Sequence, residues 1–245
     1  MKDSTFKTAF NTTSWFECGD RPFTSPVGSF DGQGLSWGPR QNNFGQGTLQ
    51  PLLQKMILTN SQAVSQCFGP LYKDLYAIVN MPDQKAQLAE VIAKMNDPKN
   101  RLLPAWSQAF SALGTNVAMQ NIFLDDAKSI LPASTELATW MGGPNYTVRT
   151  FCVAFDIVNQ DGNISTPLRL LLTSMKPLLA PFKKTDKDWV RFCCWARAAW
   201  TDFRGNQEFS QNVLARKLLI VDGHGRYGNT YIDAEQRFGI TDEVA

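Results

Sequence analysis

The stretch "SWFECGDRPFTSPVGSFDGQGLSWGPRQ", residues 14–41, places two carboxylates in unusual settings. Glu17 follows two aromatic residues, Trp15 and Phe16, and Asp31 stands fourteen residues later in a glycine-rich turn. Two surface acids, one at the end of a helix and one in a turn, would explain the pattern without any chemistry. A pair of catalytic carboxylates would explain it as well, and the rest of the chain bears on the choice.

The 245-residue chain has the composition of a globular protein with a sizeable core. Hydrophobic residues make up 43% and charged residues 19% of it. Lys plus Arg number 24 and Asp plus Glu 22, and the sequence contains no run of basic residues. This balance argues against a nucleic-acid partner. No apolar stretch reaches about 18 residues, so we expect no membrane partner either.

The cysteines and the histidine restrict the possible chemistry. No CxxC pair is present, so a zinc site or a thioredoxin-like motif is not expected. We interpret Cys152, Cys193 and Cys194 as buried apolar residues of a protein that folds in a reducing compartment. His224 is the one histidine and is expected in a turn, which leaves no His pair for a metal and disfavours a Ser-His-Asp triad. With no phosphate-binding motif, we expect no cofactor and no metal, and catalysis should depend on carboxylates.

The spacing of apolar residues predicts a mainly α protein. Thr48 is the expected N-cap of a helix in 47–60, and a break is expected at Gly69-Pro70. A small irregular hairpin is expected near 28–38. We interpret 96–104 and 180–188 as loops, so 1–245 would form a single two-lobed domain. The predicted helices lie within residues 4–17, 47–60, 61–80, 82–97, 104–124, 133–141, 146–160, 167–179, 186–202 and 207–221.

The two carboxylates suit acid/base cleavage of a glycosidic bond. At the end of a first helix, Glu17 would face the negative end of the helix dipole, and nearby aromatic rings would also favour its protonated form. A protonated carboxyl can act as a general acid. Inverting glycosidases hold the second carboxylate about 6.5–9.5 Å from the first, which leaves room for a water. Asp31 would be this base, and Ser36 could hold the water.

These residues resemble a known family. A glutamate that ends the first helix, followed by a glycine-rich hairpin, resembles the lysozyme-like superfamily. Within it, "DGQGLSWG" (31–38) is most similar to the Asp-Gly-Arg-Gly-Tyr-Thr-Ala-Gly stretch of glycoside hydrolase family 46 chitosanases. The resemblance implies a lysozyme-like fold with Glu17 as the acid and Asp31 as the base. It places Ser36 where the family has a threonine that holds the attacking water.

Two further matches concern a charge network. "VAFDIVNQDG" (153–162) is similar to the central helix of the family, and "FCCWARAAW" and "VLARKLLIV" are similar to two later helices that each bring an arginine toward it. The resemblance implies that Arg197, Asp156 and Arg216 form a network behind Glu17. An ordinary buried ion pair would also explain these residues. Residues 60–145 match nothing in the family.

The chain departs from the family in and after the hairpin. Ser36 replaces threonine and Gln33 replaces an arginine. The family lacks "GPRQNNFGQGTLQPLL" (38–53). The first four residues of this stretch, "GPRQ", are closer to the Gly-Leu-Met-Gln segment of goose-type lysozymes and lytic transglycosylases. Amides at Gln41, Asn42, Asn43 and Gln46 would suit N-acetyl groups, and Arg40 would suit the lactyl carboxylate of peptidoglycan. A polar loop of ordinary composition would look the same.

We therefore expect a peptidoglycan-cleaving lysozyme (muramidase) that hydrolyses β-1,4 bonds with inversion. Its catalytic residues would be Glu17, Asp31 and Ser36. Three alternatives stay open: a chitosanase, a lytic transglycosylase with Glu17 as its sole acid/base, and a glycan-binding module without catalysis. The expected substrate-binding residues are Trp37, Arg40, Gln41 and Asn43, with Trp15 as a further cleft residue.

The expected setting is bacteriolytic. "MKDSTFKTAFNTTSW" lacks the apolar segment of a signal peptide. We expect synthesis in a reducing cytoplasm and delivery to the periplasm or cell wall by a secretion system or by phage lysis. The alternative is a domain of a longer chain. The expected partners of a monomeric protein are a peptidoglycan glycan strand and an immunity or delivery protein.

Overall fold

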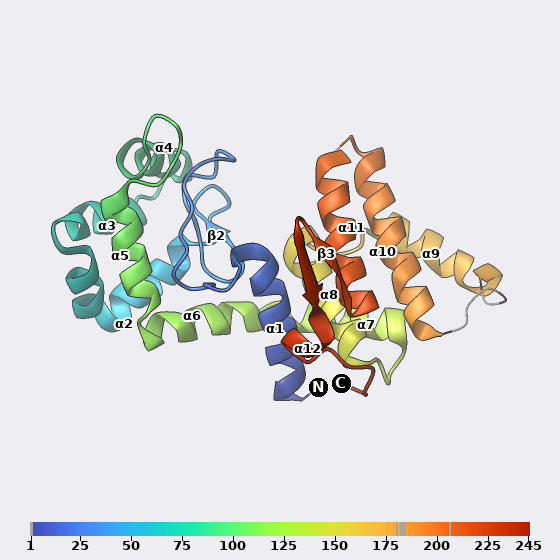
Figure 1. Ribbon diagram of the computed structural model, residues 1–245. Coiled ribbons are helices and arrows are strands. Elements are labelled where there is room, and N and C mark those ends of the chain that lie inside the picture. Colours follow the sequence, from blue (N-terminus) through green and yellow to red (C-terminus); the bar gives the residue numbers. More distant parts are fainter. Residues whose placement is uncertain (1, 180, 182–184, 206) are drawn as a thin grey trace. The chain divides into compact units, whose positions relative to one another are not determined.

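The computed structural model describes residues 2–179, 181, 185–205 and 207–245 (Figure 1). The chain forms two compact units. Unit 1 comprises Met1–Phe16 and Ile130–Ala245, and unit 2 comprises Glu17–Ser129. Helix α1 (Asp3–Cys18) belongs to unit 1 except for its last two residues. Glu17 therefore lies where the chain passes from one unit into the other.

Unit 2 combines a short hairpin with a group of helices. Strands β1 (Ser36–Trp37) and β2 (Asn42–Asn43) pair antiparallel, and Val27 forms a bridge to Ser36. Helix α2 packs against α5 and α6. The helices are α2 (Gln50–Phe68), α3 (Tyr72–Val79), α4 (Gln84–Met95), α5 (Pro104–Gly114) and α6 (Val117–Lys128), with a 3₁₀ turn, Gly69–Leu71, between α2 and α3.

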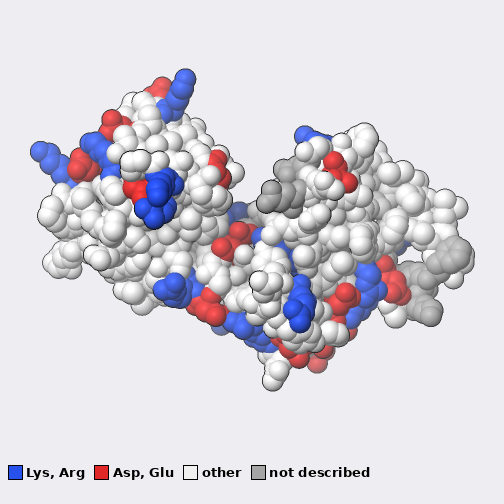
Figure 2. All heavy atoms as spheres, turned by 45° about the horizontal axis from the view of Figure 1, so that its top comes forward, with Lys and Arg blue, Asp and Glu red and all other residues white. Residues whose placement is uncertain are grey.

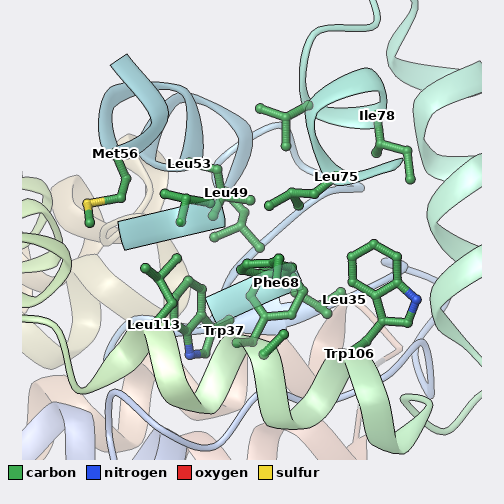
Figure 3. Close-up of a cluster of buried hydrophobic side chains, with 14 of the residues drawn as sticks. Leu35, Trp37, Leu49, Leu53, Met56, Phe68, Leu75, Ile78, Trp106 and Leu113 are labelled. Carbon is green, nitrogen blue, oxygen red and sulfur yellow. The ribbon is translucent and has the colours of Figure 1, made fainter. Parts of the chain in front are cut away.

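The core of unit 2 joins the hairpin to the helices (Figure 3). Trp37 of β1 packs edge-on against the rings of Phe110 and Phe123, at centroid distances of 5.1 and 4.9 Å. Its indole N–H donates to the carbonyl oxygen of Phe23 at 2.7 Å. Other members of this core are Leu35, Leu49, Leu53, Met56, Phe68, Leu75, Ile78, Trp106 and Leu113.

Unit 1 is built around α8, whose residues from Val148 to Val158 are all buried. Helix α8 packs against α7 and α11, and α11 packs against α10. Buried Arg149 near the start of α8 ties down the C-terminal segment through ion pairs to Glu235 and Asp242, each at 2.6 Å. The elements are α7 (Leu131–Gly142), α8 (Val148–Asp161), α9 (Thr166–Leu179), α10 (Asp186–Phe203), α11 (Gln207–Asp222), β3 (His224–Tyr227), β4 (Thr230–Asp233) and α12 (Ala234–Phe238).

The mainly helical fold expected from the sequence is confirmed, and so is the break at Gly69-Pro70. Two boundaries were wrong. The N-cap of α2 is Leu49, because the Thr48 hydroxyl instead bonds the backbone of Asn43. The predicted helix 104–124 is two helices, because the Asn116 side chain caps α6 by accepting a hydrogen bond from the N–H of Ala118.

The small irregular hairpin expected near 28–38 is confirmed. Val27 forms an antiparallel bridge to Ser36, Ser36 and Trp37 are strand, and the residues between Val27 and Ser36 form turns. A second hairpin, β3–β4, was not predicted, and His224 begins it instead of lying in a turn. Of the loop expected over 180–188, residues 180 and 182–184 lie outside the described residues.

Burial of the cysteines agrees with the sequence. Cys152, Cys193 and Cys194 are buried as thiols, and burial raises the pKa of Cys194 to about 12. Within the described parts of the chain, no helix combines the length and the apolar character needed to cross a membrane.

Candidate functional site

The end of α1 presents Glu17 beside a fixed turn of the hairpin. The helix ends at Cys18, and Gly19 follows in the left-handed region with φ +64°. The Cys18 thiol donates to the carbonyl oxygen of Gly38 at 3.2 Å and accepts from Gln41 Nε2 at 3.1 Å. The residue after Glu17 is thus attached to the turn between β1 and β2. Glu17 itself is half-buried.

That turn depends on Gly38. Its φ is +85°, and a Cβ atom there would lie 2.2 Å from the ring of Phe123. A residue with a side chain would therefore be strained and would collide with the core. Gly38 holds its carbonyl oxygen in the place where the Cys18 thiol reaches it.

Asp31 is exposed at the tip of a glycine turn. Its Oδ1 accepts a hydrogen bond from the N–H of Gln33 at 3.1 Å, as in an Asx turn. Gly32 and Gly34 have φ values of +80° and +82°, and a Cβ atom on Gly34 would lie 2.8 Å from Leu88. The Asp-Gly-Gln-Gly sequence therefore forms a tight turn that keeps the carboxylate at the surface.

Asn96 secures this turn from the end of α4. Its Oδ1 accepts from the N–H of Ser29 at 2.9 Å, and its Nδ2 donates to the carbonyl oxygen of Gly34 at 2.9 Å. The Ser29 hydroxyl in turn accepts from the N–H of Gly34 at 3.0 Å. Buried Asn96 thus closes the loop that carries Asp31. Sequence reasoning missed it, because an asparagine after a helix is usually an ordinary end signal.

Ser36 lies on β1 between two core residues. Successive side chains of a strand point to opposite faces, and both Leu35 and Trp37 point into the core. Ser36 therefore faces away from the core of unit 2, and it is 4% exposed. Its backbone is fixed by two hydrogen bonds to Val27, at 2.8 and 3.0 Å. Its role in holding a water stays a prediction.

The role expected for Trp37 was wrong. The side chain is 0% exposed and forms part of the core of unit 2, so it cannot line a binding surface. Because side chains alternate along a strand, Ser36 faces away from the core of unit 2 and Trp37 faces into it. Trp15, the other candidate, is half-buried in unit 1 against Tyr227 and Phe238.

The polar loop after β1 uses its side chains largely to hold itself together. Asn43 is 5% exposed, its Oδ1 accepts from the N–H of Gln46 at 2.8 Å, and its Nδ2 donates to the carbonyl oxygen of Gln41 at 3.4 Å. These bonds give Asn43 a structural role, and its contact with substrate stays a prediction. The amide of Gln41 is engaged with Cys18.

Arg40 is matched by an acid from α6. Its NH1 lies 3.0 Å from Asp126 Oδ2 and 3.1 Å from the Asp126 carbonyl oxygen. Buried Asn42 donates to the same carboxylate at 3.1 Å. The charge of Arg40 is therefore partly compensated by Asp126 even without a ligand. Substrate binding by Arg40 and Gln41 stays a prediction.

A buried charge network lies in unit 1 around Asp156, which is 0% exposed. Arg216 NH2 lies 2.6 Å from Asp156 Oδ1, and Lys217 Nζ lies 3.0 Å from Oδ2. The Thr13 hydroxyl of α1 donates to Oδ1 at 3.1 Å. Burial alone would raise the pKa of Asp156, but the charges and hydrogen bonds of Arg216 and Lys217 lower it to about 2.

The sequence misplaced one member of this network. Arg197 does not pair with Asp156: its Nε lies 3.7 Å from Asp161 Oδ2, and its NH1 donates to the Thr201 hydroxyl. Lys217 takes the second position on Asp156 and lies 3.3 Å from Asp161. Sequence reasoning missed Lys217 because it followed the arginines of the resembling helices. The adjacent pair Arg216-Lys217 was the signal available.

The structure thus gathers the expected residues in two sets. Glu17, Asp31 and Ser36 belong to unit 2, whereas Asp156 and Arg216 belong to unit 1 and contact α1 through Thr13 and Phe16. The first set supplies two carboxylates and a hydroxyl, which are groups suited to proton transfer. No cluster of three or more potential metal ligands occurs among the described residues.

Comparison with known proteins identifies the fold. No protein-family model matches the chain, and no curated protein does. A solved structure is similar: the complex of a Gynuella sunshinyii GH46 chitosanase with chitotetraose, at a TM-score of 0.59 and 12% sequence identity. The match covers 95% of this chain and 98% of that one. The chain therefore has the lysozyme-like, mainly helical fold of that chitosanase.

Proposed function

We propose that this protein is a glycoside hydrolase of the lysozyme type that cleaves β-1,4 bonds in the glycan strands of peptidoglycan. The observation that carries the proposal is the Asp31 turn. Two glycines of positive φ and the buried Asn96 hold an exposed carboxylate there. In the same unit, the residue after Glu17 is bonded to the neighbouring turn. The fold does not need an acidic side chain in so constrained a turn, and a catalytic role for Asp31 would explain why one is held there.

The proposed reaction is a single displacement. Glu17 donates a proton to the leaving glycosidic oxygen while that bond breaks. Asp31 takes a proton from a water, whose oxygen forms the new bond to the anomeric carbon from the opposite face. Ser36 orients the water. The product carries the inverted anomeric configuration, and both carboxylates return to their starting protonation states when protons exchange with solvent.

A chitosanase is the second candidate, and two observations favour it. The similar solved structure is of a chitosanase in complex with chitotetraose. In addition, Arg40 is matched by Asp126, which weakens the argument that it recognises a lactyl carboxylate. We favour peptidoglycan as the substrate because the segment Glu17–Ser129 carries as many basic as acidic residues. A groove for a polycation would need an acidic excess.

The charged surface is also mixed. On the face that Figure 2 shows, the described acidic and basic side chains are interspersed among a larger number of neutral ones. Such a surface suits a substrate that carries both neutral N-acetyl groups and scattered carboxylates. It does not single out a densely charged polymer.

Mass spectrometry of digestion products would test the proposal and its rivals together. Purified sacculi and soluble chitosan are each incubated with the protein. We expect reducing muropeptides from sacculi and slower release from chitosan. 1,6-Anhydro products would instead identify a lytic transglycosylase, and faster cleavage of chitosan would identify a chitosanase. Binding to sacculi without any product would leave a glycan-binding module.

A further inference from the structure

One phenylalanine of unit 2 is displayed to solvent directly beside the proposed base. Phe30 precedes Asp31 in the chain and is 73% exposed. Of the phenylalanines that the structure describes, only Phe30 and Phe203 are exposed. Phe203 contacts the ring of Trp200, at a centroid distance of 6.2 Å, whereas no aromatic ring of a described residue packs against Phe30. Single apolar residues on a surface are common, so exposure alone does not give Phe30 a role.

The backbone on both sides of Phe30 is fixed. Gly28 is pressed against the loop after α4, where a Cβ atom would lie 2.4 Å from a backbone nitrogen of that loop. Ser29 is 2% exposed, and its N–H donates to Asn96 Oδ1 at 2.9 Å. After the ring, the N–H of Gly32 donates to the carbonyl oxygen of Ser29 at 3.2 Å. The Phe30 ring is therefore held outward at a defined place and does not hang on a loose loop.

The position of Phe30 supplies a reason for its exposure. Burying a phenylalanine side chain stabilises a fold, and an exposed one forgoes that stabilisation. A short polar residue would suit a solvated turn better. Phe30 and Asp31 are both exposed in the same turn. A glycan that brings its anomeric carbon to Asp31 therefore also comes close to the ring on the preceding residue.

An aromatic ring matches the surface of a β-1,4-linked N-acetylhexosamine. The substituents of such a pyranose are equatorial, so axial C–H groups cover both of its faces. Neighbouring oxygen atoms polarise these C–H groups positively, and the face of an aromatic ring is negative. Contact between the two rings also removes apolar surface from water. Phenylalanine has no hydrogen-bonding group in its side chain, so it would recognise the face of a sugar and not its hydroxyls.

We infer that Phe30 is a substrate-binding residue that stacks on a pyranose ring of the glycan beside Asp31, a role that rests on the proposed function. It binds the sugar equally in the ground state and in the transition state, so it sets affinity and takes no part in proton transfer. The sequence resemblance did not point to Phe30, because the resembling stretch begins at Asp31.

Three substitutions separate stacking from other effects. Phe30→Ala removes the ring, Phe30→Leu keeps an apolar side chain without a ring, and Phe30→Trp enlarges the ring. Phe203→Ala is the matched control, because Phe203 is 84% exposed on α10 and has no part in the proposed reaction. For each protein, kcat and KM are measured on peptidoglycan glycan strands freed of peptide, together with the melting temperature. Isothermal titration calorimetry in a Glu17→Gln background, which prevents cleavage, gives the Kd for a tetramer of β-1,4-linked N-acetylglucosamine.

We expect Phe30→Ala to raise KM, and the Kd for the tetramer, by about 5- to 30-fold. The kcat should change by less than about threefold, because the lost interaction is equal in the ground and transition states. Phe30→Trp should keep the wild-type KM or lower it, whereas Phe30→Leu should resemble Phe30→Ala. Melting temperatures should stay near that of the wild type, because exposed side chains contribute little to stability. Phe203→Ala should match the wild type in every measurement.

Unchanged KM and Kd values in Phe30→Ala would overturn the inference, and so would wild-type affinity in Phe30→Leu, which has no ring to stack. A clear fall in the melting temperature of both variants would show that the ring holds the turn instead of the substrate. If the wild-type protein cleaves no glycan, the proposed function fails, and calorimetry then tests the inference alone. Weaker binding of the tetramer by Phe30→Ala than by Phe203→Ala would support it. Equal affinity of these two proteins, or no binding by either, would contradict it.

Discussion

At the scale of single residues, the chain gives its two carboxylates different surroundings. Glu17 is half-buried at the end of a helix, directly after Trp15 and Phe16, whereas Asp31 is exposed in a turn. A group that must deliver a proton benefits from partial exclusion of water, and a group that must accept one benefits from solvation. The surroundings agree with the proposed roles of acid and base.

Glu17→Gln should abolish hydrolysis and leave the fold intact. The amide has nearly the same shape but cannot supply a proton, and loss of a general acid costs about 10²–10⁴ in rate. Release of reducing ends from sacculi measures the effect, with circular dichroism as the check on folding. A variant that keeps more than half of the wild-type activity would remove Glu17 from the role of acid.

Asp31→Asn should be equally severe if water is the nucleophile. The side-chain oxygen could still accept the hydrogen bond from the N–H of Gln33, so the turn should survive. The activity should not survive, because an amide cannot act as the base. Proton NMR during the first minutes of digestion would show the anomeric configuration of the product. An active Asp31→Asn protein would favour the transglycosylase, which needs a single carboxylate.

At the scale of elements, the hairpin depends on a contact that is distant in sequence. Asn96→Ala would leave the buried N–H of Ser29 and the carbonyl oxygen of Gly34 without this partner. Each such loss costs about 1–3 kcal/mol. We expect a lower melting temperature and reduced activity together, because the loop that carries Asp31 would loosen.

Asn80→Ala is the matched control for this prediction. Asn80 is an exposed asparagine at the end of α3, and its side chain bonds only the local carbonyl oxygen of Tyr76 among the described contacts. Differential scanning fluorimetry and the sacculus assay on both variants complete the comparison. Equal behaviour of the two variants would mean that Asn96 does not hold the turn.

Most elements could be predicted from the sequence because their signals are local. Helix ends are marked by Pro82 and Asp83 before α4 and by Gly69-Pro70 after α2. These residues act on the backbone of their immediate neighbours, so the signal is local. The β3–β4 hairpin escaped prediction because its residues, "HGRYGNTYID", alternate weakly and two of its glycines mask the strand pattern.

The site was predictable only in part, for a related reason. Glu17 and Asp31 are recognisable from their immediate neighbours. The inward direction of Trp37 and the partner of Arg40 depend on α5 and α6, which lie far along the chain. Similarly, no local pattern distinguishes Arg197 from Lys217 as the cation on Asp156. That outcome depends on how α10 and α11 pack beside α8.

At the scale of the whole molecule, unit 1 owes part of its stability to Asp156. Asp156→Ala would leave Arg216 and Lys217 without the carboxylate that they share, at a cost of about 3–5 kcal/mol. Chemical denaturation followed by tryptophan fluorescence measures this loss. A free energy of unfolding equal to that of the wild type would show that the buried network contributes nothing.

The lowered pKa of Asp156 also predicts how the stability of the protein depends on pH. The pKa of Asp156 is lowered from 3.8 to about 2 in the folded protein. Its stabilisation is therefore complete above the unfolded pKa and is lost as pH falls through the folded pKa. Wild type should lose more stability than Asp156→Asn between about pH 4 and pH 2. Parallel curves for the two proteins over that range would contradict the prediction.

We propose that this chain hydrolyses a β-1,4 glycan with Glu17 as its acid, and that peptidoglycan is the substrate. The most direct test is the initial rate of reducing-end release from sacculi and from soluble chitosan. Wild type and Glu17→Gln are compared at low and moderate ionic strength. We predict that wild type cleaves sacculi faster than chitosan at both, and that Glu17→Gln cleaves neither. Faster cleavage of chitosan at both ionic strengths would rule out peptidoglycan as the preferred substrate, and an active Glu17→Gln protein would rule out Glu17 as the acid.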